Sequence, residues 1–99
     1  MRTKKEEYID RIAAQLREWS ATIDELEIRA SRAPDTMEAG FDESIRILKE
    51  GRDLLAGRLE GMRASTGEAW SALTAGVDAA KDEIRNAFAA AKEKFRKAA

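Results

Sequence analysis

Residues 9–33 read IDRIAAQLREWSATIDELEIRASRA, and this stretch decides the fold. Its apolar residues recur at spacings that alternate between three and four, which places them along one seam of a coiled-coil helix. Acidic residues stand four positions before basic ones at Glu7 and Arg11 and at Glu25 and Arg29, which stabilises an exposed helix face. We therefore expect a helix over residues 4–32, with a packing seam of Ile9, Ile12, Leu16, Trp19, Ile23, Leu26, Ala30 and Ala33.

The only proline of the chain, Pro34, interrupts this pattern. A proline inside a helix removes a backbone hydrogen bond and clashes with the preceding turn, so the first helix should end here. Asp35 and Glu38 then have the form of a capping box, in which the two side chains satisfy the first amide groups of a new helix. We expect a second helix over residues 36–64 that folds back on the first as an antiparallel hairpin.

The second helix carries a weaker seam than the first. Arg52 occupies one of its core positions, and each glycine inside the helix lowers its stability by about 1 kcal/mol relative to alanine. The glycines either permit close helix packing or are tolerated weaknesses, and the sequence leaves both interpretations open. The seam comprises Phe41, Ile45, Leu48, Leu55, Leu59 and Met62, and the glycines are Gly40, Gly51, Gly57 and Gly61.

The last third of the chain repeats every eleven residues, as GEAWSALTAGV, DAAKDEIRNAF and AAAKEKFRKAA. Eleven residues make about three helical turns, so the same face recurs and predicts a long amphipathic helix over residues 67–96. Ser65 and Glu68 form a second capping-box pattern that would start a separate helix, whereas the seam spacing across them also fits one helix continuous with the second. The face that could meet a membrane or a partner comprises Trp70, Leu73, Val77, Ile84, Phe88 and Phe95, flanked by Lys81 and Lys92.

The composition argues against catalysis. The chain has no histidine and no cysteine, so the usual general base, the thiol nucleophile and the commonest metal ligands are missing. Neighbouring carboxylates such as Asp82 and Glu83 diverge by about 100 degrees on a helix, and we interpret them as solvated faces. We expect no enzyme activity, no cofactor and no bound metal. The 18 basic and 19 acidic residues nearly cancel, which makes nucleic acid a poor partner.

The two tryptophans and the lack of long apolar runs indicate whether the protein contacts a membrane. Trp19 is in register with the first seam and is expected in the core, whereas Trp70 could be core or could anchor an interfacial helix. Residues 1–8 are charged and do not precede the apolar segment of a signal peptide, and no apolar run reaches the roughly 20 residues of a membrane span. We expect a cytoplasmic protein, either free or peripheral at a membrane.

The segments KEEYIDRIAAQLREW at residues 5–19, IDELE at residues 23–27 and residues 70–95 resemble a family of small bacterial coiled-coil proteins associated with stress responses. The resemblance covers most of the chain and departs from the family pattern at Pro34. It implies a cellular context and brings no catalytic or binding residues. The eleven-residue segment is also similar in pattern to the amphipathic repeats of apolipoproteins and desiccation-protective proteins.

These observations predict one all-α domain over residues 1–99, an antiparallel helical hairpin or coiled coil with a long amphipathic C-terminal helix. A seam as long as residues 9–30 needs a partner, so the leading hypothesis is a structural or interaction protein that forms homo-oligomers. The alternative is a peripheral membrane-binding protein in which residues 70–95 lie on an anionic membrane surface. Another protein could occupy the same face.

Overall fold

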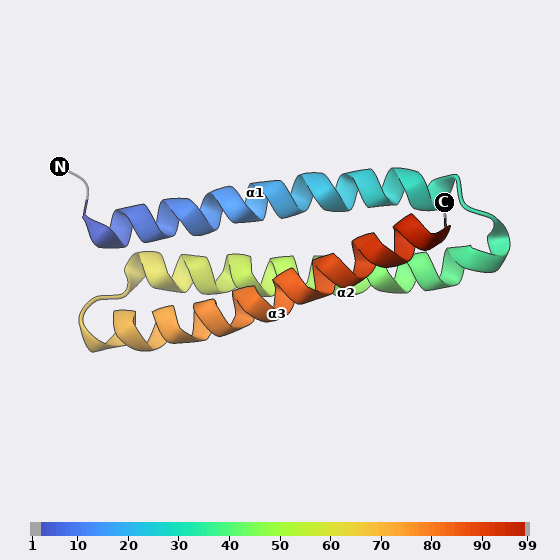
Figure 1. The fold of residues 1–99 in the computed structure, drawn as a ribbon. Coiled ribbons are helices and arrows are strands. Elements are labelled where there is room, and N and C mark those ends of the chain that lie inside the picture. Colours follow the sequence, from blue (N-terminus) through green and yellow to red (C-terminus); the bar gives the residue numbers. More distant parts are fainter. Residues whose placement is uncertain (1–2, 99) are drawn as a thin grey trace.

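The computed structural model describes residues 3–98, apart from the side chains of Glu38 and Ala98, and is all-α as expected. Its helices are α1 (Lys4–Ser31), α2 (Asp35–Ala64) and α3 (Glu68–Ala98). They run alternately up and down in an elongated bundle that measures 51 × 23 × 18 Å (Figure 1). The hairpin of α1 and α2 is antiparallel, and α3 folds back along α2.

The connection between α1 and α2 is short and depends on Pro34. The last turn of α1 closes with the Arg32 amide donating to the carbonyls of Ala30 and Arg29. Pro34, at φ −59° and ψ 148°, then occupies the position before α2, and its carbonyl accepts from the Met37 amide at 2.9 Å.

The expected capping box at this point is wrong in its first residue. Asp35 is already the first residue of α2, and no side chain caps the helix because the capping position belongs to Pro34. The side chain of Glu38, the second member of the box, lies outside the described residues.

The conformation between α2 and α3 shows whether these residues form one continuous helix or two separate helices. Ser65 is extended, at φ −87° and ψ 155°, and its hydroxyl donates to the carbonyl of Met62 at 2.9 Å. Ser65 therefore caps the C-terminus of α2, and it does not start α3 as a capping box would require. Gly67 follows at φ +61°, a left-handed conformation that favours glycine, and its carbonyl accepts from the Trp70 amide. The chain thus reverses direction, and the continuous alternative does not occur.

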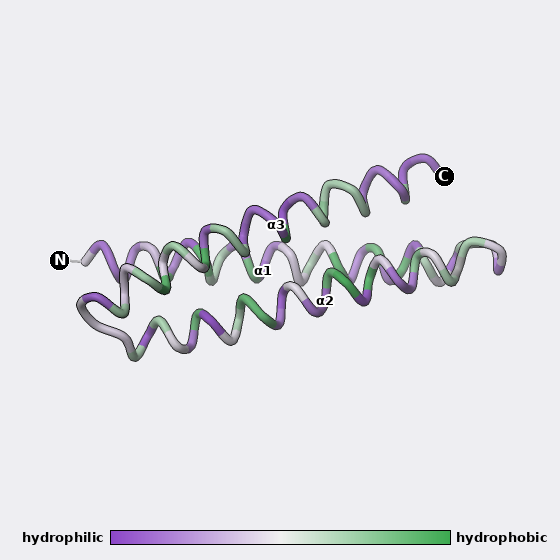
Figure 2. Tube along the Cα trace, turned by 90° about the horizontal axis from the view of Figure 1, so that it is seen from below, coloured by the Kyte–Doolittle hydropathy of each residue, from purple (hydrophilic) through white to green (hydrophobic). Residues whose placement is uncertain are grey.

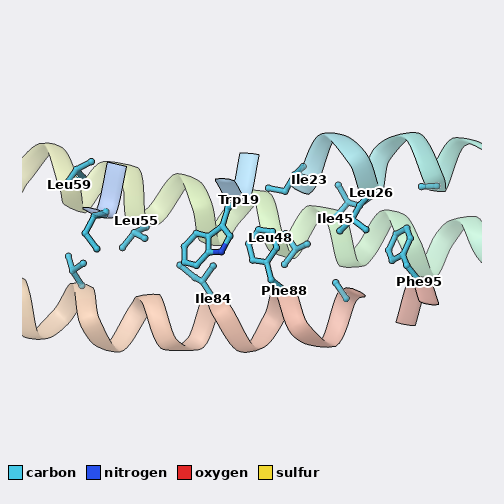
Figure 3. Packing of buried hydrophobic residues seen from close by; sticks show 14 of the residues in the cluster. Trp19, Ile23, Leu26, Ile45, Leu48, Leu55, Leu59, Ile84, Phe88 and Phe95 are labelled. Atoms are coloured by element: carbon cyan, nitrogen blue, oxygen red, sulfur yellow. The ribbon is translucent and has the colours of Figure 1, made fainter. Parts of the chain in front are cut away.

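The core of the bundle runs along its whole length and is apolar. Trp19 of α1 stacks on Phe88 of α3 with 5.2 Å between ring centroids, and Phe41 of α2 stacks on Phe95 of α3 at 4.0 Å. Figure 3 shows Trp19 reaching from α1 toward Ile84 and Phe88. Among the described residues no polar or charged residue is buried, so the core depends on shape and apolar area alone.

Candidate interaction surface

The predicted seams pack on each other inside a single chain. Twelve of the fourteen predicted seam residues are buried, and Leu16 and Ala33 are partly buried against the same core. The helix that covers the first seam therefore comes from the same chain, and this seam needs no second copy for its burial. The twelve buried residues are Ile9, Ile12, Trp19, Ile23, Leu26, Ala30, Phe41, Ile45, Leu48, Leu55, Leu59 and Met62.

The predicted membrane or partner face of α3 is also turned inward. Its four buried residues are Val77, Ile84, Phe88 and Phe95, and Trp70 and Leu73 are partly buried. The flanking Lys92 is exposed and Lys81 is half-buried at the edge. In this fold α1 and α2 cover the apolar face of α3.

A polar cluster ties the start of α1 to the start of α3. The Tyr8 hydroxyl donates to Asp78 Oδ1 at 2.5 Å, and the Tyr8 ring meets Trp70 edge-on with 5.6 Å between centroids. Lys5 Nζ lies 5.5 Å from the Trp70 ring centre and donates to the carbonyls of Arg63 and Ser65 at the end of α2. Burial, followed by the hydrogen bond to Asp78, raises the pKa of Tyr8 far above its usual range. This cluster joins three segments of the bundle, the start of α1, the end of α2 and the start of α3.

The remaining charged side chains could act as metal ligands or form ion pairs. Within residues 3–98 there is no cluster of three carboxylates that could hold a metal ion. Most of the ion pairs lie on the surface and join neighbouring turns of one helix, and Lys49 of α2 joins Glu27 of α1 at 3.1 Å. Such exposed pairs orient side chains and contribute little free energy.

The glycines of α2 divide into two kinds. A Cβ on Gly51 would lie 3.0 Å from Ile84 Cγ1, so Gly51 permits the close approach of α2 to α3. A Cβ on Gly57 or Gly61 would meet nothing within 4 Å. Gly51 therefore serves close helix packing, whereas Gly57 and Gly61 are tolerated weaknesses of the helix.

The outward side of α2 carries a second apolar stripe that sequence reasoning missed. Ile47 and Leu54 are 46% and 53% exposed, although residues of this size normally contribute to a core. Ile47 and Leu54 lie seven positions apart, and Gly57 and Gly61 extend the same face of the helix. We call Ile47, Glu50, Leu54, Gly57 and Gly61 the outer α2 face; all five residues are exposed. The signal was present as a second heptad spacing in α2, but the core seam of the same helix masked it.

The surroundings of the outer α2 face are apolar on one flank and charged on the other. A shallow groove between α2 and α3 adjoins Ile47 and is lined by Ala87, Ala90 and Ala91. On the other side Arg46 donates to Glu43 and, at 2.6 Å, to Glu50. The hydrogen bond from Arg46 to Glu43 lowers the pKa of Glu43. Figure 2 shows α2 along one edge of the bundle. The residues of the outer α2 face are exposed.

Comparisons with models of protein families, with curated proteins and with solved structures find no match for this chain. The arrangement of its own residues is therefore the basis for a functional assignment.

Hydrophobic and hydrophilic residues alternate along all three helices in Figure 2, and within residues 3–98 no helix has the length and apolar content to cross a membrane.

Proposed function

We propose that this protein is a non-catalytic helical bundle that acts by self-association and forms homo-oligomers through the outer α2 face. The observation that carries the proposal is the exposure of Ile47 and Leu54 on one face of a bundle whose core is already complete. Covering large apolar side chains is favourable by about 25 cal/mol for each Å² removed from water. A second helix laid along α2 would cover both.

Three observations support a non-catalytic role. The chain has no histidine or cysteine, the described ion pairs are exposed, and Tyr8 and Asp78 are engaged with each other in a helix junction. The protein would then act through contacts made by its surface. The resemblance to bacterial stress-associated coiled-coil proteins and the expected cytoplasmic location belong to the same proposal, in which the oligomer is a structural or protective assembly.

Sedimentation velocity of the full chain over a range of concentrations tests the proposal. We expect the mass to rise with concentration to at least that of two chains, and Leu54→Glu to return it to that of one chain. Ile28→Glu on α1 is the matched control, because Ile28 is 54% exposed and lies away from the outer α2 face. A single-chain mass for the unaltered protein at every concentration would refute self-association.

A second candidate function, peripheral membrane binding by α3, is favoured by the way α3 is held. Close backbone approaches join α3 to α2, whereas α3 meets α1 mainly through long side chains such as Trp19 and Tyr8. A turn about the connection at Gly67 would bring the apolar face of α3 toward lipid, with Lys81 and Lys92 near anionic headgroups. Vesicles of phosphatidylglycerol and phosphatidylcholine test this: binding should shift the fluorescence of Trp70 to shorter wavelength in a Trp19→Phe variant. No binding to vesicles with a high anionic fraction would exclude it.

A further inference from the structure

The outer α2 face has a symmetry of its own about Leu54. Ile47 lies seven positions before Leu54 and Gly61 seven positions after it. Glu50, which also accepts from Arg46 of its own chain at 2.6 Å, lies four positions before it and Arg58 four positions after it. Ile47, a large apolar residue, is thus as far from Leu54 as Gly61, which has no side chain. The acidic Glu50 is as far from Leu54 as the basic Arg58. Glu50, Leu54, Arg58 and Gly61 are all exposed.

An antiparallel copy of α2 converts this symmetry into contacts. At a rise of about 1.5 Å per residue, Ile47 and Gly61 each lie roughly 10.5 Å from Leu54 along the helix axis. A two-fold axis beside Leu54 therefore brings Ile47 level with Gly61 of the partner subunit. The same operation brings Glu50 level with Arg58 of the partner subunit, and each contact occurs twice.

We infer that the partner on the outer α2 face is a second copy of this chain, bound antiparallel with Leu54 on the two-fold axis. This inference rests on the proposed self-association and specifies its geometry. A two-fold interface must be complementary to itself, and this surface is so in shape and in charge. The side chain of Ile47 fills the depression at Gly61 of the partner subunit, where a Cβ would meet nothing within 4 Å.

A parallel pair of α2 helices lacks these contacts. It would set Ile47 against Ile47 of the partner subunit and Glu50 against Glu50 of the partner subunit, and like charges at the same level repel. The glycines would also face each other and leave a gap without packing. Charge and shape therefore select the same antiparallel orientation.

Cysteine cross-linking measures the register directly, because the natural chain has no cysteine to interfere. A disulfide needs Cα atoms no more than about 7 Å apart. Leu54→Cys lies on the axis and should give a covalent dimer under mild oxidation. The matched control is Ile28→Cys, whose parent residue is equally exposed on α1 and which should remain largely monomeric.

Two further variants distinguish antiparallel from parallel pairing. Ile47→Cys alone should not cross-link, because in the antiparallel register its partner lies about 21 Å away along the helix. Gly61→Cys alone should behave in the same way. An equimolar mixture of the two variants should form a mixed covalent dimer. Strong cross-linking of Ile47→Cys alone would overturn the antiparallel register.

A charge exchange supplies an independent measurement. Glu50→Lys should raise the dissociation constant roughly tenfold, since two ion pairs per dimer become repulsive. Adding Arg58→Glu in the same chain should restore most of the affinity. Exchange of Glu25 and Arg29, an exposed pair on α1, is the control and should leave the dissociation constant unchanged.

The outcomes separate this inference from the proposed function. An oligomer by sedimentation with no cross-link at Leu54→Cys leaves self-association intact and refutes the two-fold axis at Leu54. A protein that sediments as a single chain at every concentration refutes both.

Discussion

The two interfaces of α3 solve the same packing problem in different ways. Against α2, small residues let the backbones come close, as at Gly51, where a Cβ would lie 3.0 Å from Ile84. Against α1, aromatic side chains span a wider gap, with Trp19 stacked on Phe88 and Tyr8 edge-on to Trp70. Around Gly51 the contact of α3 with α2 depends on the absence of a side chain, although Phe41 of α2 stacks on Phe95 of α3 elsewhere along this interface. The contact with α1 depends instead on large side chains.

This difference predicts opposite responses to mutation. Removing atoms should destabilise the aromatic interface between α1 and α3, because the lost ring leaves a cavity between backbones that are held apart. Adding atoms should destabilise the close interface between α2 and α3, because there is no room for them.

The largest effect is expected from Trp19→Ala. Trp19 is 5% exposed and joins α1 to Phe88, so its loss should lower the free energy of unfolding by about 3–5 kcal/mol. Trp70→Ala should cost distinctly less, because Trp70 is only partly buried. Urea denaturation followed by circular dichroism compares the two variants. Equal losses would mean that both tryptophans belong to one kind of interface.

The next effect separates the two kinds of glycine in α2. Gly57→Ala should stabilise the bundle by up to about 1 kcal/mol, since alanine is the better helix former and the position is open. Gly51→Ala should instead destabilise it, because overpacking against Ile84 costs about 1–3 kcal/mol and exceeds that gain. Thermal and urea unfolding of both variants provide the measurement. Stabilisation by Gly51→Ala would show that α3 can move away without loss.

Tyr8 tests the polar end of the α1 and α3 interface. Tyr8→Phe removes the hydrogen bond to Asp78 and should lower the free energy of unfolding by about 1 kcal/mol near neutral pH. In the bundle the pKa of Tyr8 is raised above its ordinary value near 10, so the folded state favours the neutral phenol. This contribution to stability is therefore complete below pH 10 and is lost as the pH rises through the folded-state pKa.

The pH effect has a direct readout, because Tyr8 is the single tyrosine of the chain. The absorbance of tyrosinate should appear at higher pH in the native protein than in urea. The excess loss of stability above pH 10 should be absent from Tyr8→Phe, which controls for every other effect of high pH on the bundle. Identical tyrosinate titrations of native and unfolded protein would contradict the hydrogen bond between Tyr8 and Asp78.

The smallest effect is expected at Lys5. Lys5→Met keeps the aliphatic stem but removes the ammonium group above Trp70 and its bonds to the carbonyls at the end of α2. The loss should be roughly 0.5 kcal/mol, as for a cation over an aromatic ring at an exposed site. A loss as large as that of Trp70→Ala would show that the ammonium group, rather than the rings, holds this end of the bundle.

Much of the fold could be read from local patterns. The heptad spacing of residues 9–33 predicted α1, Pro34 predicted its end, and the eleven-residue repeat predicted the amphipathic character of α3. The outer α2 face could not be recognised in the same way. Ile47 and Leu54 stand in a helix that has other apolar residues in a core seam, and only the packing distinguishes the two sets.

By itself the sequence determined where helices form and which side of each is apolar, because helix propensity, proline and apolar periodicity act over a few turns. Tertiary structure decided what covers each apolar side. Helices of 28, 30 and 31 residues match in length, so a chain that reverses at Pro34 and at Gly67 can cover its own seams from end to end. Because α2 packs one face against α1 and α3, Ile47 and Leu54 on its other face remain exposed.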